Sequence, residues 1–117
     1  MIKKVYKAID NPLGFVMLKS KPKIHDVVIT FDEFNDEQKK KLLYFREVIT
    51  SKIGDCEMSI FGSQIKGNWD ETSDYDIVIY NMPSREDMIY LKGFNYGFKV
   101  DMFFKQGDKY FERAVNF

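Results

Sequence analysis

The sequence has very few of the residues that would suggest disulfide, zinc or histidine chemistry. Among its 117 residues are one cysteine and one histidine, and the formal net charge is zero. Cys56 alone cannot form an intramolecular disulfide, and His25 alone cannot build a zinc site or a Ser-His-Asp triad. Net neutrality also removes the simplest argument for a nucleic-acid coat protein. Six lysines within residues 1–23 leave direct nucleic-acid binding open as the least favoured class of partner.

Long apolar segments are also absent. Uncharged runs such as Met58–Ile65 and Ile77–Ser84 are far shorter than the ~20 residues that cross a bilayer. No charged and then apolar leader resembles a secretion signal, so the expected location is the cytoplasm, with no membrane contact. With 44% hydrophobic and 16% aromatic residues the chain can bury a core, and we expect a single domain over residues 1–117.

The clearest element in the sequence is a helix that begins after Asn35. Asn35 is a plausible N-cap, apolar residues then recur at helical spacing from Leu42 to Ile53, and Gly54 follows. A second, shorter helix is expected from the cap Ser84 to about Gly93. The tail after Asp108 is expected to add another helical turn or two.

Short apolar runs predict the strands. Three of them are bordered by Gly, Asn or Asp and read as strands, namely Cys56–Phe61, Tyr75–Tyr80 and Phe98–Phe104. Leu13–Leu18 and Ile24–Phe31 predict a hairpin within an N-terminal extension, residues 1–34, whose role the sequence does not reveal. The order of elements predicts an α+β fold in which helices flank a small mixed sheet.

A Gly-Ser pair stands where the first of these strands ends. Gly62 would let backbone N–H groups approach an anion closely, and the Ser63 hydroxyl is a further donor. The positive end of a following helical turn would add to the attraction. Such a pair often forms only a turn, so phosphate binding is a hypothesis that depends on the neighbouring residues.

Two aspartates open the most β-prone run of the chain. Asp74 and Asp76 are two residues apart, which places both carboxylates on one side of a strand. Like charges so placed repel each other, and a divalent cation between them is a physical reason to keep both. Asp101 interrupts a later strand-like run and is either an acid on the wet face of an edge strand or a third ligand. Three carboxylates could bind two Mg²⁺ ions and align a nucleophile with a phosphorus atom.

Together these residues resemble a known pattern. Gly62-Ser63, Lys66-Gly67 and Ser73-Asp74-Tyr75-Asp76, followed by an Asp on a later strand, are similar to the nucleotidyltransferase pattern of the DNA polymerase beta superfamily. The resemblance is greatest to the minimal nucleotidyltransferases, small proteins that often act as antitoxins paired with HEPN-domain toxins. It covers residues 58–80 and reaches Asp101 by strand order.

The resemblance implies a polymerase beta-like nucleotidyltransferase fold and a metal-dependent transfer of a nucleoside monophosphate from an NTP to a hydroxyl group. ATP is the favoured donor, two Mg²⁺ ions are the implied cofactors, and Mn²⁺ can substitute. Asp74 and Asp76 would bind both metals, and Asp101 would complete one site and take the acceptor's proton. Gly62, Ser63 and Lys66 would hold the triphosphate. Gln64 stands where the family often has a basic residue.

Two functions from different classes follow. The first is an enzyme whose acceptor is a hydroxyl group, expected on a partner protein such as a HEPN toxin. The second is a non-catalytic, antitoxin-like module that uses the same fold to neutralise a partner by contact. The enzyme requires its metal and its aspartates, whereas the binding module requires neither.

Overall fold

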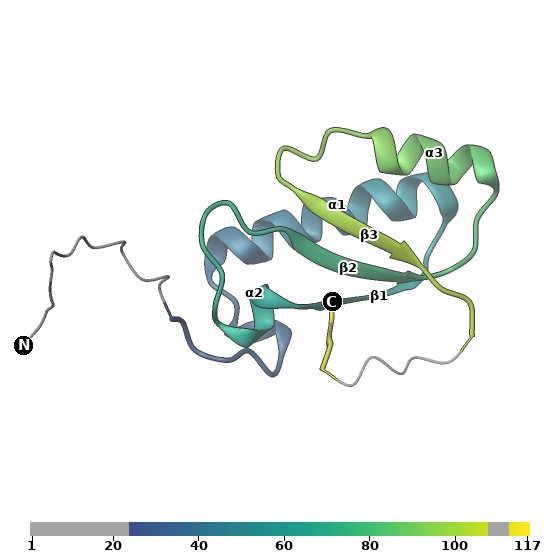
Figure 1. The fold of residues 1–117 in the computed structure, drawn as a ribbon. Helices are drawn as coiled ribbons and strands as arrows, with labels where there is room; N and C mark the ends of the chain where they lie inside the picture. The colour runs from purple at the N-terminus through teal and green to yellow at the C-terminus, as the bar shows by residue number, and fades with distance from the viewer. Residues whose placement is uncertain (1–23, 108–112) are drawn as a thin grey trace, which may run out of the picture.

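A computed structural model describes residues 24–107 and 113–117. The chain forms a four-stranded sheet with helices (Figure 1). Its elements are, in chain order, η1 (Phe31–Glu33), α1 (Asp36–Ile53), β1 (Glu57–Phe61), α2 (Ser63–Lys66), β2 (Tyr75–Tyr80), α3 (Arg85–Gly93), β3 (Val100–Phe104) and β4 (Val115–Asn116). The predicted α+β class with a small mixed sheet is confirmed.

Helix α1 begins and ends as the sequence predicts. The Asn35 side chain accepts a hydrogen bond from the Gln38 backbone N–H at 2.8 Å, and the Gln38 side chain accepts from the Asn35 N–H at 3.1 Å. This reciprocal capping box satisfies two backbone donors that the first turn would otherwise leave free. At the other end of the helix, the Gly54 N–H donates to the Thr50 carbonyl.

The sheet has the order β3-β2-β1-β4, and only the β2–β3 pair is parallel. A parallel pair needs a crossover connection, and α3 lies in the connection between β2 and β3. The Ser84 side chain caps α3 by accepting from the Asp87 N–H, as its spacing predicts. The β1–β2 connection carries α2 and the loop that leads into Asp74.

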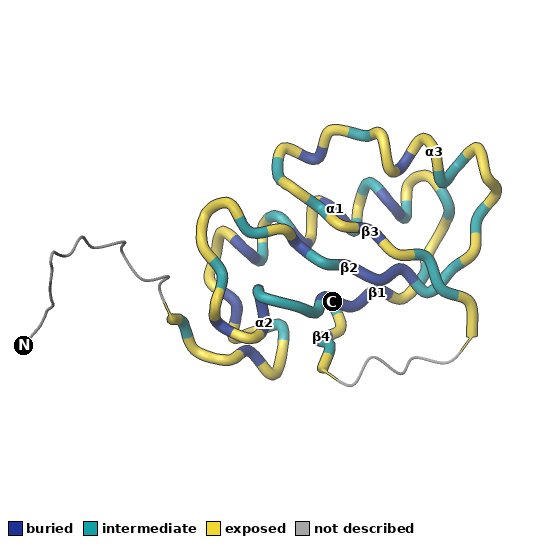
Figure 2. Tube along the Cα trace, in the orientation of Figure 1, coloured by how far each residue is buried: buried dark blue, intermediate teal, exposed yellow. Residues whose placement is uncertain are grey.

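The core lies between the sheet and the helices α1 and α3. Side chains from one face of the sheet and from the inner sides of both helices are almost fully buried, among them Leu42, Phe45, Ile49, Ile60, Ile77, Ile79 and Leu91. Figure 2 shows these buried positions along β1 and β2 and at intervals along α1. Because side chains alternate along a strand, Asp76 lies on the opposite face from Ile77. None of the described helices combines the length and the apolar character that a membrane span needs.

Two sequence predictions about the ends of the chain are wrong where the structure can test them. Residues 24–29 form no strand, and Phe31–Glu33 is a 3₁₀ helix. The backbone of this segment bonds instead to the region of α2, through Val28 N–H to the Ile65 carbonyl at 2.9 Å. The end of the chain forms the short strand β4 rather than a helical turn. Leu13–Leu18 and residues 108–112 lie outside the described residues.

Strand boundaries shift slightly from the prediction. The strand expected from Cys56 begins at Glu57, and the one expected from Phe98 begins at Val100. Strand β2 has the predicted bounds. Asp74 therefore lies just before β2 rather than in it.

Candidate functional site

The face of the sheet opposite α1 and α3 brings Asp76 and Asp101 together. In the parallel β2–β3 register the two residues are direct partners, so their side chains leave the same face of neighbouring strands. Phe61 of β1 pairs with Asp76 on the other side, and its ring contacts Phe103 at 5.5 Å between centroids. The two carboxylates thus lie side by side next to an aromatic pair.

Among the three aspartates, Asp76 is the one whose pKa is shifted by the other two. Burial raises the pKa of Asp76, and the neighbouring negative charges of Asp101 and Asp74 raise that pKa further. The ammonium group of Lys66 acts in the opposite direction. Asp76 therefore responds electrostatically to both other predicted acids and to the predicted phosphate counter-charge.

Asp74 lies close to this pair but also has a cationic neighbour. Its carboxylate is 3.8 Å from the ammonium nitrogen of Lys99, and both side chains are well exposed. Within the described ranges, no group of three or more His, Cys, Asp or Glu side chains is close enough to hold a metal ion. The three carboxylates are therefore neighbours on one face without forming a closed ligand set.

Gly62 joins β1 to α2 and lies against Asp76. Its φ of 80° falls in the left-handed region, and a Cβ at this position would overlap the Asp76 carboxylate. Only glycine lets the backbone pass this close. Ser63 follows as the first residue of α2, and its hydroxyl makes no hydrogen bond within the described part of the chain. Lys66, at the end of α2, is exposed.

Gln64 has a role that the sequence does not reveal. Its side chain is 1% exposed, and its Oε1 accepts a hydrogen bond from Gln38 Nε2 at 2.8 Å. Gln64 therefore points into the protein and links α2 to α1, away from any phosphate held by Gly62 and Ser63. No local pattern in the sequence signals this contact, because the two glutamines are 26 residues apart.

The loop between α2 and β2 is held by its own polar side chains. Asp70 Oδ1 accepts from the backbone N–H of Thr72 at 2.8 Å and from its hydroxyl at 2.7 Å. These hydrogen bonds lower the pKa of Asp70. Trp69 stacks on His25 with ring centroids 3.8 Å apart, so His25 packs against this loop.

Comparison with known proteins bears directly on this arrangement. The family model described as Nucleotidyltransferase domain matches residues 44–113, which is more than half of the chain and contains all the residues of the candidate site. The chain belongs to the nucleotidyltransferase domain family. No curated protein and no solved structure shows a significant match to it.

Membership of this family indicates the substrate class and the general reaction of the domain. A nucleotidyltransferase domain implies a nucleoside triphosphate as substrate and nucleotide transfer as reaction. The small α+β architecture with a mixed sheet is consistent with the polymerase beta-like fold of such domains.

Proposed function

We propose that this nucleotidyltransferase domain is an active Mg²⁺-dependent enzyme that moves AMP from ATP to an acceptor hydroxyl and releases pyrophosphate. The observation that carries the proposal is the direct pairing of Asp76 with Asp101 on the sheet face opposite α1 and α3, against the backbone of Gly62. Burial raises the pKa of Asp76, and repulsion by the neighbouring carboxylates raises that pKa further. A site built in this way favours a cation.

The donor set fits Mg²⁺. The ion prefers oxygen ligands and combines one or two carboxylates with water and substrate phosphates, so an incomplete protein cage suits it. Asp74, Asp76 and Asp101 would hold the ions, two in number, and Mn²⁺ can substitute. Bound Mg²⁺ supplies positive charge that neutralises the triphosphate and stabilises the leaving pyrophosphate.

Residues of the chain itself accept the proton of the acceptor and bind the triphosphate. Asp101 accepts the proton of the acceptor hydroxyl. The acceptor oxygen then forms a bond to the α-phosphorus, the bond from that phosphorus to the bridging oxygen breaks, and pyrophosphate leaves with the electron pair. Gly62 allows the triphosphate to approach the backbone, Ser63 offers a hydroxyl donor, and Lys66 offers a positive charge. ATP as donor and a partner protein as acceptor, such as a HEPN toxin, follow from the family resemblance alone.

A labelling experiment tests the proposal. The domain is incubated with MgATP labelled at the α-phosphate and with a candidate partner protein, and the label retained on that protein is measured. We expect labelling by the wild type and none by Asp76→Asn, with the fold intact because the variant removes a repelling charge. Asp55→Asn, an exposed aspartate at the opposite end of β1 from Gly62, is the matched control and keeps full labelling. Equal labelling by Asp76→Asn would overturn the catalytic assignment.

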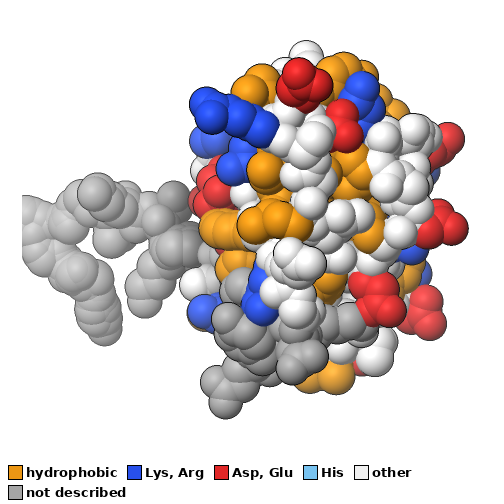
Figure 3. Space-filling model, turned by 90° about the vertical axis from the view of Figure 1, so that its right-hand side faces the viewer, with side chains coloured by type: hydrophobic (Ala, Val, Ile, Leu, Met, Phe, Trp, Pro, Cys, Tyr) orange, Lys and Arg blue, Asp and Glu red, His pale blue; other side chains and the backbone are white. Residues whose placement is uncertain are grey.

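A second candidate is the non-catalytic binding module. Its support is a set of exposed apolar side chains on the two long helices, including Leu43, Tyr44, Ile89 and Tyr90. Figure 3 shows how hydrophobic side chains reach the surface on one side of the molecule, between acidic and basic groups. A binding module retains its effect on the partner in EDTA and with Asp74→Asn, whereas the enzyme loses its effect under both conditions.

A further inference from the structure

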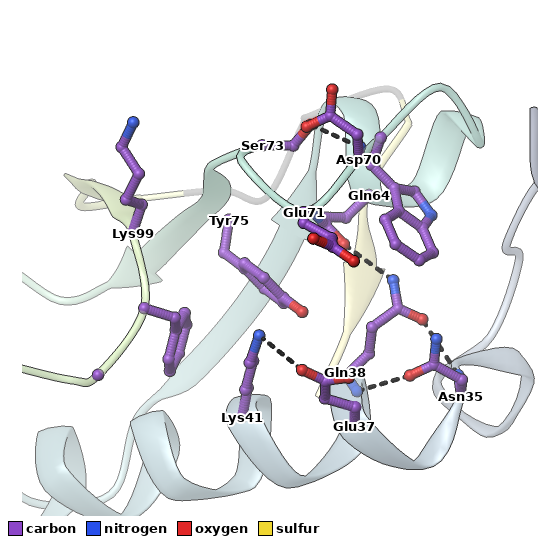
Figure 4. A pocket seen from close by; sticks show the side chains of 13 residues that line it. Asn35, Glu37, Gln38, Lys41, Gln64, Asp70, Glu71, Ser73, Tyr75 and Lys99 are labelled. Atoms are coloured by element: carbon purple, nitrogen blue, oxygen red, sulfur yellow. Dashed lines mark hydrogen bonds and ion pairs between the residues drawn. The ribbon is translucent and has the colours of Figure 1, made fainter. Parts of the chain in front are cut away.

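A cavity of about 420 Å³ lies beside the carboxylate site but does not include the three aspartates. It is bounded by the first turns of α1, by the loop between α2 and β2, and by the turn before β3 (Figure 4). The volume is within the range of small-molecule sites, roughly 300 to 1,000 Å³. The cavity meets the candidate site at Lys99, which lines it and pairs with Asp74.

Two buried polar side chains that line this cavity have groups without partners. Tyr75 is 6% exposed and Gln64 is 1% exposed. In the described part of the chain, the Tyr75 hydroxyl makes no hydrogen bond. The amide nitrogen of Gln64 also makes none, because only its oxygen is bonded, to Gln38. Figure 4 shows the Tyr75 hydroxyl directed into the space between the helix and the loop. Buried polar groups are almost always paired, so these two point to a ligand.

The charges around the cavity argue against an anionic ligand. Lys41 pairs with Glu37 at 3.2 Å, and Lys99 pairs with Asp74. The lining also includes Glu71, an exposed acid that has no partner among the residues described here. The cations of the wall are thus already paired, and one carboxylate is left as an acceptor.

Aromatic side chains complete the wall. Phe98 and Tyr75 lie edge to face with ring centroids 4.9 Å apart. The Lys41 ammonium lies 5.4 Å from the Tyr75 centroid and 5.6 Å from that of Phe98. The cavity therefore combines an aromatic wall, against which the Lys41 ammonium lies, with two hydrogen-bond donors and one acceptor.

We propose that this cavity binds a nucleobase that carries an exocyclic amine. Ring nitrogens and carbonyl oxygens of such a base accept from the Tyr75 hydroxyl and the Gln64 amide, and its amine donates to the Glu71 carboxylate. A phosphate or a simple carboxylate lacks a donor for Glu71 and finds no unpaired cation. A sugar lacks an aromatic ring that could pack beside Tyr75 and Phe98.

The base can come from two sources, the NTP donor itself or a second nucleoside. The inference rests on the cavity and its unpaired groups, and the proposed transfer reaction is not among its premises. The ion pair between Lys99 and Asp74 joins the cavity wall to the carboxylate site, whereas Tyr75 and Asp76 leave opposite faces of β2. If the cavity holds the base of the NTP donor, a free nucleoside competes with the triphosphate for it. If the cavity holds a second nucleoside, the two bind without competition.

Calorimetric titration with nucleosides tests the inference on the full chain. The probes are adenosine and cytidine, which carry the amine, uridine, which lacks it, and ribose 5-phosphate, which has no base. We expect adenosine or cytidine to bind more tightly than uridine, and ribose 5-phosphate not to bind. Tyr75→Phe should weaken nucleoside binding about three- to tenfold, the value of one hydrogen bond. Tyr44→Phe, an exposed tyrosine outside the cavity, is the matched control.

The outcomes separate this inference from the proposed function. Tyr75→Phe removes a hydroxyl without a partner, so the variant folds with an unchanged or higher melting temperature. Nucleoside binding that persists in Asp76→Asn supports the cavity even if nucleotide transfer is never observed. Competition with MgATP assigns the cavity to the donor base, and its absence assigns the cavity to a second nucleoside. The inference is overturned if neither adenosine nor cytidine binds, or if Tyr75→Phe binds the nucleoside as tightly as the wild type does.

Discussion

At the scale of single residues, the contact between Gly62 and Asp76 is the most specific feature of the candidate site. Gly62 has a φ that L side chains rarely adopt, and its missing Cβ leaves the space that the Asp76 carboxylate occupies. The backbone conformation and the carboxylate position therefore depend on each other. A side chain here would disturb both at once.

Gly62→Ala is predicted to lower stability by about 1 to 3 kcal/mol, because the left-handed conformation and the close approach both become strained. NTP binding should weaken more than this loss of stability explains, since the added Cβ displaces Asp76. Urea unfolding and MgATP titration measure the two effects. Gly93→Ala is the control, because its Cβ would meet nothing within 4 Å and its residue ends a helix. A Gly62→Ala variant that binds MgATP like the wild type would contradict the assigned cradle.

Single residues also mark where sequence reasoning succeeds and fails. The sequence predicts a role for Asp74, Asp76 and Asp101, because acids are uncommon beside and within β-prone runs, and that role stays a prediction. The contacts of Gln64 with Gln38 and of Lys99 with Asp74 are not visible, because side-chain pairs distant in sequence depend on the packing of elements.

At the scale of elements, α1 supports the site through its first turn. The capping box of Asn35 and Gln38 fixes that turn, and Gln38 uses its remaining amide to hold Gln64 of α2. The start of α1 thus positions both the wall of the cavity and the short helix that follows Gly62.

Asn35→Ala is predicted to lower the free energy of unfolding by about 1 kcal/mol, the usual cost of losing an N-cap. Denaturant unfolding followed by circular dichroism measures this change. Asn68→Ala serves as control, because Asn68 is exposed and makes no side-chain hydrogen bond in the described ranges. Equal stability of Asn35→Ala and Asn68→Ala would mean that the cap contributes nothing.

The elements divide clearly into predictable and unpredictable ones. Helix α1 and strand β2 follow from a cap, a periodicity and a bounded apolar run. The segment Ile24–Phe31 has the β-branched residues of a strand, but its backbone donors bond to the turn around α2, where no strand edge is available. Strand β4 has two residues, too few for an alternating pattern to appear.

At the scale of the whole molecule, two buried tyrosines make the free energy of unfolding depend on pH in the alkaline range. Burial raises the pKa of Tyr75 and of Tyr96 to about 12, above the ordinary value of about 10. The Tyr96 hydroxyl also donates to the Leu91 carbonyl at 2.7 Å. Their neutral forms are therefore favoured in the folded state. This contribution to stability is complete below pH 10 and is lost as the pH rises through 12.

We predict that the free energy of unfolding falls between pH 10 and 12 and that Tyr96→Phe reduces this fall. At neutral pH the same variant loses about 1 kcal/mol, because the hydrogen bond to Leu91 is gone. Urea unfolding at a series of pH values measures both effects. Tyr44→Phe should keep most of the wild-type pH dependence, since Tyr44 is exposed and adds less to the raised pKa of Tyr96 than burial does. An unchanged alkaline slope in Tyr96→Phe would contradict the role given to its burial.

The whole-molecule arrangement explains why the site could be predicted only in outline. Alternation along β3 predicts which face Asp101 occupies, but not its partner. The β2–β3 register, set by the parallel crossover through α3, places Asp101 opposite Asp76. Register depends on the packing of all layers and is therefore absent from any local segment of sequence.

The measurement that tests the central claim most directly is calorimetric titration of MgATP into the wild type and into the double variant Asp74→Asn with Asp76→Asn. It requires no knowledge of the acceptor. The account predicts binding that depends on Mg²⁺, disappears in EDTA and in the double variant, and persists in Asp55→Asn. If no NTP binds with Mg²⁺ or Mn²⁺, or if the double variant binds as well as the wild type, the carboxylate face is not a nucleotide-transfer site.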